Sequence, residues 1–257
     1  MGTFRMSKDF IEYVIVSQTS QSGDYLALNL KNRLKPKRAW RSSDTSQQEI
    51  VIDLLSARNN PEVHVEITNA PAIRFIGGDD GSTFNGFDSG NITMKIDPKQ
   101  GVYRYGGPLT GFNHRYVKVV VPTGSPTDGA AFFSIGTLSF MASTELMVLN
   151  PEQGVAYGEA GSDGFLVNDF ESGGSDVYDL TVLRPLTIEM SIRQPFKDGS
   201  SPMIWDMFRS KATIVYVNFG LGESWQAYLV RRVSGLREAR DSFSYVRFDT
   251  LEVALVV

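Results

Sequence analysis

The chain has 257 residues, enough for one large β domain or two domains of ordinary size. Its hydrophobic content of 42% and charged content of 21% are typical of a globular protein, and a net charge of −4 gives no reason to expect nucleic-acid binding. The absence of cysteine excludes disulfides, thiolate nucleophiles and cysteine-ligated metals. No apolar run reaches the roughly 20 residues of a membrane helix, so we expect no membrane insertion.

The first half of the sequence is dominated by signals for short β-strands. Runs rich in β-branched residues alternate with polar residues, and turns rich in Gly, Asn, Asp and Pro separate them. The opening run MGTFRMSKDFIEYVIV predicts a strand rather than a signal peptide, because it has no small-residue cleavage site. The other expected strands in this half cover residues 50–52, 63–67, 92–96 and 116–121. Many short strands of this kind predict an all-β fold, as a β-sandwich or jelly roll.

Residues 145–180 have a different composition. They contain eight acidic residues and no Lys or Arg, and they are rich in Gly. We therefore place a domain boundary near residue 150, which gives a jelly roll at 1–150 and a smaller β-sandwich at 151–257. The first strand, at residues 8–16, pairs either within the jelly roll or with the second domain. In the latter case the jelly roll is an insertion.

The second domain contains the one convincing helix signal. Ser201 is a good N-cap, Pro202 suits the first helical position, and apolar residues follow on one face, which predicts a helix over 202–211. The expected strands of this domain are residues 180–193, 212–219, 225–233 and 243–257. We expect the domain to serve in oligomerisation, because an apolar C-terminal strand ending in LEVALVV is prone to aggregate unless a neighbour covers it.

Acid–base chemistry is poorly represented in this sequence. The only histidines are His64, which alternates with apolar residues of a strand, and His114, which precedes an arginine. No metal-protease, nucleophile-elbow or phosphate-loop motif is present. We expect both histidines to lie at the surface and the protein to have no catalytic activity.

The loop GGDDGSTFNGFDSGN, at residues 77–91, concentrates carboxylate, amide and hydroxyl oxygens. Asp79 and Asp80 are candidate Ca²⁺ ligands, because Ca²⁺ prefers several oxygen ligands in a glycine-bent loop. The spacing does not match an EF-hand, and Asp and Asn also stabilise turns by themselves. We therefore prefer a solvated turn with no cofactor, and keep Ca²⁺ as the alternative.

Sugar recognition uses an aromatic face together with a few convergent polar groups. The candidate sugar-binding residues are Trp40, Arg74, Tyr103, Tyr105 and Phe112. The segment GVYRYGGPLTGFNHRY, which contains three of them, is rich in aromatic residues and glycine. Aromatic residues also plug the open ends of β-sandwiches, and that structural role is the alternative we favour for them.

A basic segment and an acidic segment suggest assembly. Six cationic residues and no acidic one occur within residues 31–41, while residues 145–180 are acidic. Candidate oligomer contacts are therefore Lys35, Lys37, Arg38, Glu159 and Asp163, because opposite patches associate head to tail and close into rings. Two unrelated solvated faces are the equally weighted alternative.

Two stretches resemble the galactose-binding-like (discoidin-type) jelly rolls. The first is ALNLKNRLKPKRAWRSSDTSQQEIVIDLLSA and the second is RYVKVVVPTGSPTDGAAFFSIGTLSFM. The matching positions are Ala27, Asn29, Leu30, Trp40, Ser42, Ser43, Gln48, Ile50, Ile52, Asp53, Leu54, Arg115, Tyr116, Ile135, Gly136 and Leu138. The resemblance covers about residues 10–145. It implies that Trp40 plugs the end of the barrel and that IVIDL enters the core. Leu55 stands where the family has a glycine, so no ligand residue is carried over.

The jelly roll joined to a small β domain resembles tail-tip and baseplate proteins of tailed bacteriophages, and residues 180–257 resemble the belt domain of distal tail proteins. This resemblance implies a virion structural protein that forms a ring, trimer or hexamer at the tail end after assembly in the host cytoplasm. Its partners would be other tail and baseplate proteins and a host-surface glycan. The alternative is a carbohydrate-binding module without catalytic activity.

Overall fold

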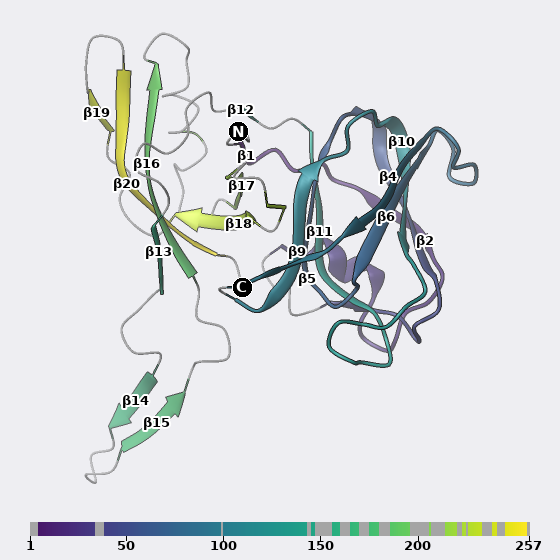
Figure 1. Cartoon of the computed structure of the whole chain (residues 1–257), viewed down its shortest axis with the longest axis horizontal. Helices are drawn as coiled ribbons and strands as arrows, with labels where there is room; N and C mark the ends of the chain where they lie inside the picture. The colour runs from purple at the N-terminus through teal and green to yellow at the C-terminus, as the bar shows by residue number, and fades with distance from the viewer. Residues whose placement is uncertain are drawn as a thin grey trace. The chain divides into compact units, whose positions relative to one another are not determined.

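Figure 1 shows the protein as a computed structural model. The structure describes residues 5–33, 39–98, 100–142, 145–146, 156–159, 165–169, 175–179, 186–195, 206, 214–219, 223–224, 226–232, 238–240 and 245–255. The chain divides into two compact units. Unit 1 contains Met1–Val148 and Ile214–Leu229, and unit 2 contains Leu149–Thr213 and Val230–Val257.

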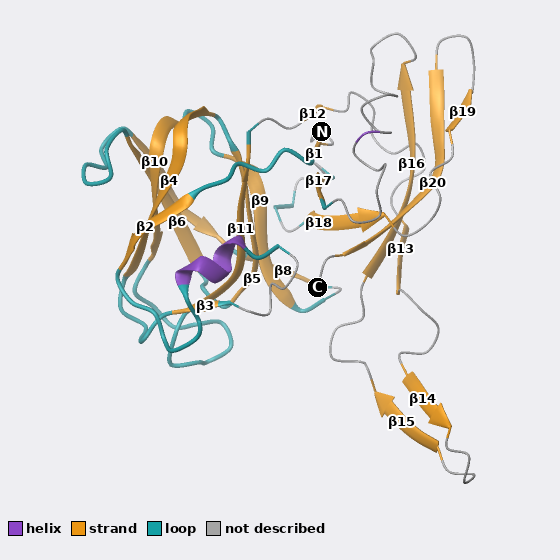
Figure 2. Ribbon diagram, turned by 180° about the vertical axis from the view of Figure 1, so that it is seen from behind, coloured by secondary structure: helices purple, strands orange, loops and turns teal. Residues whose placement is uncertain are grey.

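The main body of unit 1 is a β-sandwich of two five-stranded antiparallel sheets. Sheet I has the order β2 (Val14–Gln18), β4 (Gln48–Asn59), β10 (Asn113–Val121), β6 (Ala72–Gly78) and β7 (Phe87–Thr93). Sheet II has the order β3 (Trp40–Arg41), β11 (Ser134–Met141), β5 (Glu62–Thr68), β9 (Val102–Pro108) and β8 (Lys95–Asp97). Figure 2 shows these strands in orange, with the short 3₁₀-helix η1 (Ala27–Lys31) in purple.

The core lies between the two sheets and follows from strand alternation. Ile50, Ile52 and Leu54 of β4 face inward because every second side chain of a strand points to the same face. Val63 and Val65 of β5 meet them from the other sheet. Trp40 is fully buried and belongs to this core. The expected all-β fold with a jelly-roll sandwich is confirmed.

Several strands of unit 1 lie outside the sandwich. β1 (Arg5–Ser7) pairs antiparallel with β12 (Glu145–Leu146) on one side and with β17 (Val215–Asn218) on the other. β17 is followed in the sheet by β18 (Ala227–Arg232). The sandwich is therefore inserted between two neighbouring strands, β1 and β12. Residues 5–7 pair outside the sandwich, whereas residues 14–18 pair within it.

Unit 2 is described by its strand pairing. β16 (Leu186–Pro195) pairs with β20 (Tyr245–Leu255) and with β13 (Ala156–Glu159). β19 (Glu238–Arg240) and the last residues of β18 also pair with β20, and β14 (Phe165–Asp169) forms a separate hairpin with β15 (Ser175–Asp179). The helix expected over 202–211 lies outside the described residues except for Asp206, which is helical.

The division of the chain differs in one respect from the expected domains. The cut after Val148 falls beside the boundary expected near residue 150, but Ile214–Leu229, which we expected in the second domain, groups with unit 1. The reason is that β17 pairs with β1, a contact between segments far apart in the sequence. No helix in the described part of the chain has the length and apolar character needed to span a bilayer.

Candidate functional site

A cavity of about 400 Å³ opens at one end of the sandwich, where β5 ends and β9 begins. Three segments form its walls. They are the end of β5 and the residues after it (Ile67–Asn69), the β8–β9 hairpin (Ile96 and Gly101–Tyr103), and the loop before β11 (Thr127, Asp128 and Ser134). We call this cavity the β5–β9 pocket. Its size falls within the range of small-molecule sites, roughly 300–1,000 Å³.

A β-bulge shapes the first wall of the pocket. Glu66 pairs with Arg104 and Thr68 pairs with Tyr103, so Ile67 is an extra residue with no partner in β9. Its φ of 53° lies in the left-handed region, which is a genuine outlier for a β-branched residue. Such strain costs about 1–3 kcal/mol and persists only when the surroundings enforce it. The strained residue lies in the wall of the cavity, and strain of this kind concentrates at functional sites.

A buried asparagine holds the third wall in place. The Asn69 amide nitrogen donates to both carboxylate oxygens of Asp128, at 3.1 and 3.2 Å, and to the carbonyl of Phe132 at 3.0 Å. Its amide oxygen accepts from the backbone N–H of Ser134 at 2.6 Å. The backbone N–H of Thr127 donates to the Asn69 carbonyl at 2.8 Å. One buried side chain therefore fixes the position of the Asp128 carboxylate.

Several groups in the pocket remain available to a ligand. Tyr103 is half-buried with its ring packed against the core, and Asp128 is exposed. Within the described part of the chain, neither the Tyr103 hydroxyl nor the Ser134 hydroxyl makes a hydrogen bond. The residues that line the pocket thus include an aromatic residue, two residues with unbonded hydroxyls and a carboxylate, and hydrogen bonds hold the carboxylate in place before any ligand arrives.

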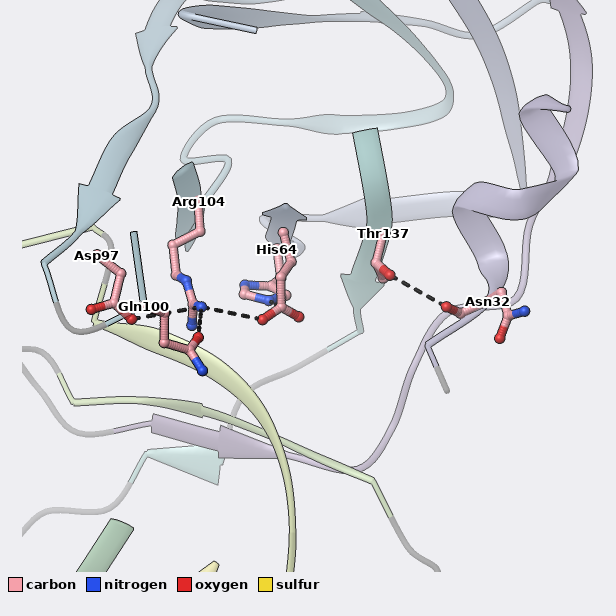
Figure 3. Close-up of polar contacts among 7 residues, drawn as sticks. Asn32, His64, Asp97, Gln100, Arg104 and Thr137 are labelled. Atoms are coloured by element: carbon pink, nitrogen blue, oxygen red, sulfur yellow. Dashed lines mark hydrogen bonds and ion pairs between the residues drawn. The ribbon is translucent and has the colours of Figure 1, made fainter. Parts of the chain in front are cut away.

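A buried ionic cluster anchors two of the walls from behind, on the outer face of sheet II (Figure 3). The fully buried Arg104 donates to the Gln100 side chain and lies 3.5 Å from a Glu66 oxygen and 3.6 Å from an Asp97 oxygen. Glu66 precedes the bulge at Ile67. Asp97 and Gln100 belong to the β8–β9 turn, which is closed by hydrogen bonds to the Asp97 carbonyl. Arg104 therefore ties the bulge to the hairpin.

His64 belongs to the same cluster and corrects one expectation. Its Nε2 lies 3.5 Å from a Glu66 oxygen and its side chain is fully buried, so the prediction of a surface histidine is wrong. The alternation did place His64 on the outer face of the sheet, but β17 covers that face, and the Tyr216 ring lies 5.5 Å from the imidazole.

Figure 3 also shows a contact between β11 and the residue after η1. The hydroxyl of Thr137, in β11, donates to the Asn32 carbonyl at 3.3 Å.

The charges of the cluster balance in favour of an ionised Glu66. Burial alone raises the pKa of Glu66, but the Arg104 charge together with the hydrogen bond and charge of His64 outweighs it. The pKa of Glu66 is therefore held below its ordinary value of 4.5. The arrangement is an internal ionic cluster that positions backbone segments, because all of its charged members are buried.

The five candidate sugar-binding residues do not form one site. Tyr103 lines the β5–β9 pocket. Trp40 is fully buried and its indole N–H donates to the Ser20 carbonyl at 3.1 Å, so no face of its ring is free for a sugar. Phe112 is also fully buried, against Phe87 and His114 at the opposite end of the sandwich.

Arg74 and Tyr105 also lie outside the pocket. Arg74 is exposed on sheet I, where its Nε donates to Asp88 at 2.7 Å. Tyr105 is half-buried in β9, two residues from Tyr103 on the same side of the strand. Of the five predicted residues, only Tyr103 therefore contributes to the cavity described above.

The loop with Asp79 and Asp80 is organised by its own hydrogen bonds. An Asp80 oxygen accepts from the backbone N–H and the hydroxyl of Ser82, which with Thr83 lowers the pKa of Asp80 to about 2. Asp79 lies 2.8 Å from Nδ1 of His114. The described residues contain no group of three or more His, Cys, Asp or Glu side chains arranged to hold a metal. The Ca²⁺ site stays a prediction.

The candidate oligomer contacts are outside the part of the chain where side chains are described. Lys35, Lys37, Arg38 and Asp163 lie outside the described residues, and Glu159 is described only as a backbone position in β13. Head-to-tail pairing of the two charged segments stays a prediction.

Asn69, Asp128 and Ser134 line the pocket but were not predicted from the sequence. Asn69 and Asp128 are 59 residues apart, so only the folded sheets bring them together. A weak signal was present. The turn PTGSPTDG contains Asp128 before Gly129, which adopts a φ of 72°. Asp–Gly pairs mark turns, but a turn does not reveal which strand end it faces.

Comparison with known proteins found likeness in shape only. No protein-family model matches the sequence, and no curated protein matches it. CBM32-3 of a family 31 glycoside hydrolase from Clostridium perfringens is 12% identical with a TM-score of 0.42, and covers 51% of this chain and 91% of its own. The C-terminal domain of a chitobiase from Bacteroides fragilis is 20% identical with a TM-score of 0.42, over 55% of this chain and 99% of its own.

An animal lectin has a comparable likeness. The F-lectin (fucolectin) from Morone saxatilis serum, the striped bass, is 14% identical with a TM-score of 0.41, and covers 55% of this chain and 50% of its own. All of these TM-scores lie below 0.5, so the ligands of these proteins are not carried over to this chain.

Proposed function

We propose that this protein binds carbohydrate without catalysis and that the β5–β9 pocket is its sugar site. The observation that carries the proposal is that Tyr103, Ser134 and Asp128 line one cavity of about 400 Å³. These groups match the two surfaces of a sugar ring. Its C–H face packs on an aromatic ring, and its hydroxyls bond to hydroxyl and carboxylate groups.

The way in which the pocket is held supports ligand binding and not catalysis. Its walls are held by the Asn69 hydrogen bonds and by the buried Arg104 cluster, so little ordering is required when a ligand binds. Preorganisation of this kind improves affinity by lowering the entropic cost of binding. A cavity of this size accommodates about one or two sugar rings, so we expect modest affinity, in the range of about 10 µM to 1 mM.

The test is glycan binding with a matched pair of tyrosine variants. A glycan array followed by calorimetry identifies and quantifies the ligand. Tyr103→Ala removes the ring from the pocket, and Tyr105→Ala removes a half-buried ring on the same side of β9 that does not line it. We expect Tyr103→Ala to weaken binding about tenfold or more and Tyr105→Ala to leave it within about twofold. Absence of glycan binding, or equal effects of the two variants, would contradict the proposal.

A structural role in a phage tail tip or baseplate is the second candidate. It is favoured by an apolar groove of about 330 Å³ between β2 and η1, where Val14, Leu26 and Leu28 are 51%, 39% and 62% exposed. Exposed apolar surface of this kind often marks an assembly contact. In this proposal the protein is a ring-forming component of the virion, with other tail proteins and a host glycan as partners.

The solution mass distinguishes the two candidates. Light scattering behind a sizing column is expected to give a monomer for a free binding module and a trimer, hexamer or larger ring for a tail component. Leu28→Ser, which changes an exposed residue of the groove, is expected to dissociate a ring if the groove is its interface.

A further inference from the structure

We infer that the β5–β9 pocket selects sugars by charge, and that it binds sugars with a free amino group more tightly than neutral sugars while rejecting acidic ones. This inference rests on the proposed function, because it specifies the ligand of the same pocket. The inference depends on the Asp128 carboxylate, because Asp128 is the only charged residue among the described residues that line the cavity.

The carboxylate is fixed in place and still has capacity to accept. Its two oxygens share the Asn69 amide donor, and Oδ1 also accepts from the backbone N–H of Ala130 at 3.0 Å. An ionised carboxylate offers about four acceptor positions, so these neutral donors leave room for one from a ligand. None of them is a cation, so the negative charge of Asp128 is not neutralised by the groups that orient it.

The neighbouring groups are suited to an ammonium rather than to an anion. Tyr103 lines the same cavity, and the face of an aromatic ring attracts a cation placed over it. The remaining lining is formed by hydroxyl, amide and aliphatic groups, which carry no charge. A sugar ammonium therefore finds an opposite charge and an aromatic residue, whereas a sugar carboxylate or sulfate finds hydroxyl donors but no cation to offset the repulsion of Asp128.

A neutral sugar takes an intermediate position. Its hydroxyls donate charge-assisted hydrogen bonds to the ionised Asp128, but they lack the positive charge that adds direct attraction between an ammonium and the carboxylate. The expected order of affinity is amino sugar, then neutral sugar, then acidic sugar. We expect the amino sugar to bind about tenfold more tightly than the neutral sugar in 50 mM salt. This ratio should become smaller in 500 mM salt, because Asp128 is exposed and salt screens exposed charges.

The experiment compares sugars that differ only in charge. The full chain is titrated by calorimetry with glucosamine, glucose and glucuronate, and with galactosamine, galactose and galacturonate, so that one stereochemical series fits the pocket. Asp128→Asn keeps the shape of the side chain and removes its charge. Asp24→Asn, which removes an exposed carboxylate that does not line the pocket, is the matched control.

We expect Asp128→Asn to abolish the tenfold preference for the amino sugar, because amino-sugar binding weakens more than neutral-sugar binding when the charge is removed. Asp24→Asn should preserve the preference. Equal affinity for the three sugars of a series, or preference for the acidic one, overturns the charge selection. In that case the proposed function still stands if Tyr103→Ala weakens sugar binding. Failure of every sugar to bind overturns both. Melting temperatures of the two Asn variants confirm that each is folded.

Discussion

The two ends of the jelly roll contain similar residues and are built differently. At the pocket end, Tyr103 and Asp128 line an open cavity. At the other end, which we call the aromatic end, Phe112 is fully buried with its ring centroid 5.3 Å from Phe87 and 5.6 Å from His114. Both ends have aromatic rings and acidic loops. Composition alone therefore does not distinguish a site from a plug.

The backbone makes the difference between the ends. At the aromatic end, Gly77 and Gly86 let the rings approach, since an added Cβ would lie 2.6 and 2.2 Å from His114 atoms. At the pocket end, the bulge at Ile67 inserts an extra residue beside β9, and the Arg104 cluster holds it there. The aromatic end is therefore filled by rings that pack closely against the backbone. At the pocket end, the strained extra residue Ile67 forms part of the wall of a cavity.

Removal of Arg104 should produce the largest loss of stability. Arg104→Met removes the buried cation that Glu66 and Asp97 share, and breaking a buried ion pair costs about 4 kcal/mol. Urea unfolding measures the loss. Arg74→Gln, which breaks the exposed pair with Asp88, is the control and should cost less than about 1 kcal/mol. Equal losses would show that Arg104 has no special role at the pocket end.

The same variant should change the response to acid. In the wild type the pKa of Glu66 is lowered, so its ionised form stabilises the protein above pH 4.5, and this contribution is lost as pH falls through the lower folded value. Without Arg104, burial raises the pKa, and protonation then relieves the buried charge. The stability difference between Arg104→Met and wild type should therefore be smaller at pH 4 than at pH 7.

Truncation of one ring at each end should sharpen the contrast. Phe112→Ala creates a cavity in a closely packed end and should cost about 3 kcal/mol. Tyr103→Ala removes a half-buried ring at the edge of an existing cavity and should cost about 1 kcal/mol. Thermal and urea unfolding of both variants check this order. A larger cost for Tyr103→Ala would mean that the ring is part of the core and is not held for a ligand.

Glycine replacement tests backbone crowding with a smaller effect. A Cβ on Gly78 would lie 2.1 Å from the Thr83 carbonyl oxygen, which belongs to the backbone, so Gly78→Ala should cost about 2 kcal/mol. Gly101, in the pocket wall, has a φ of 67° and open space around its Cβ position. Gly101→Ala should cost about 1 kcal/mol through backbone strain alone. Similar melting temperatures for the two variants would contradict the difference in crowding.

The smallest expected effects come from the two strained residues. Leu55 and Ile67 have φ values of 65° and 53°. Leu55 is 52% exposed, so Leu55→Asn should stabilise the protein by about 0.5 kcal/mol, because Asn tolerates the left-handed region better. Ile67→Asn should relieve similar strain but weaken sugar binding, since Ile67 lines the pocket. Calorimetry with sugar should detect no change for Leu55→Asn.

Strand alternation in the sequence predicted much of the fold, and its failures have physical causes. The strands at 50–52, 63–67 and 116–121 lie within β4, β5 and β10 because their apolar faces alternate into the core. The expected strand at 92–96 is divided. β7 ends at Thr93 in sheet I, and β8 begins at Lys95 in sheet II. Alternation continues across Met94, so the pattern does not reveal that the chain changes sheets there.

The site was less predictable than the fold. Tyr103 was identified because an aromatic residue in a glycine-rich segment is a typical sugar-binding signal. Trp40 and Phe112 carry the same signal but are buried, since burial depends on what the rest of the chain places over them. Asn69 and Asp128 gave no joint signal, because their contact depends on two loops meeting at the end of the sandwich.

The pairing of β1 with β12 implies an order of folding. Without the sandwich, forming this pair would close a loop of well over a hundred residues, and the entropic cost of closure rises with loop length. The folded sandwich removes most of that cost, because Phe10 and Met141 already form a bridge and the Ile11 N–H donates to the Phe140 carbonyl at 2.8 Å. The β1–β12 pairing should therefore form after the jelly roll, as a late event that depends on it.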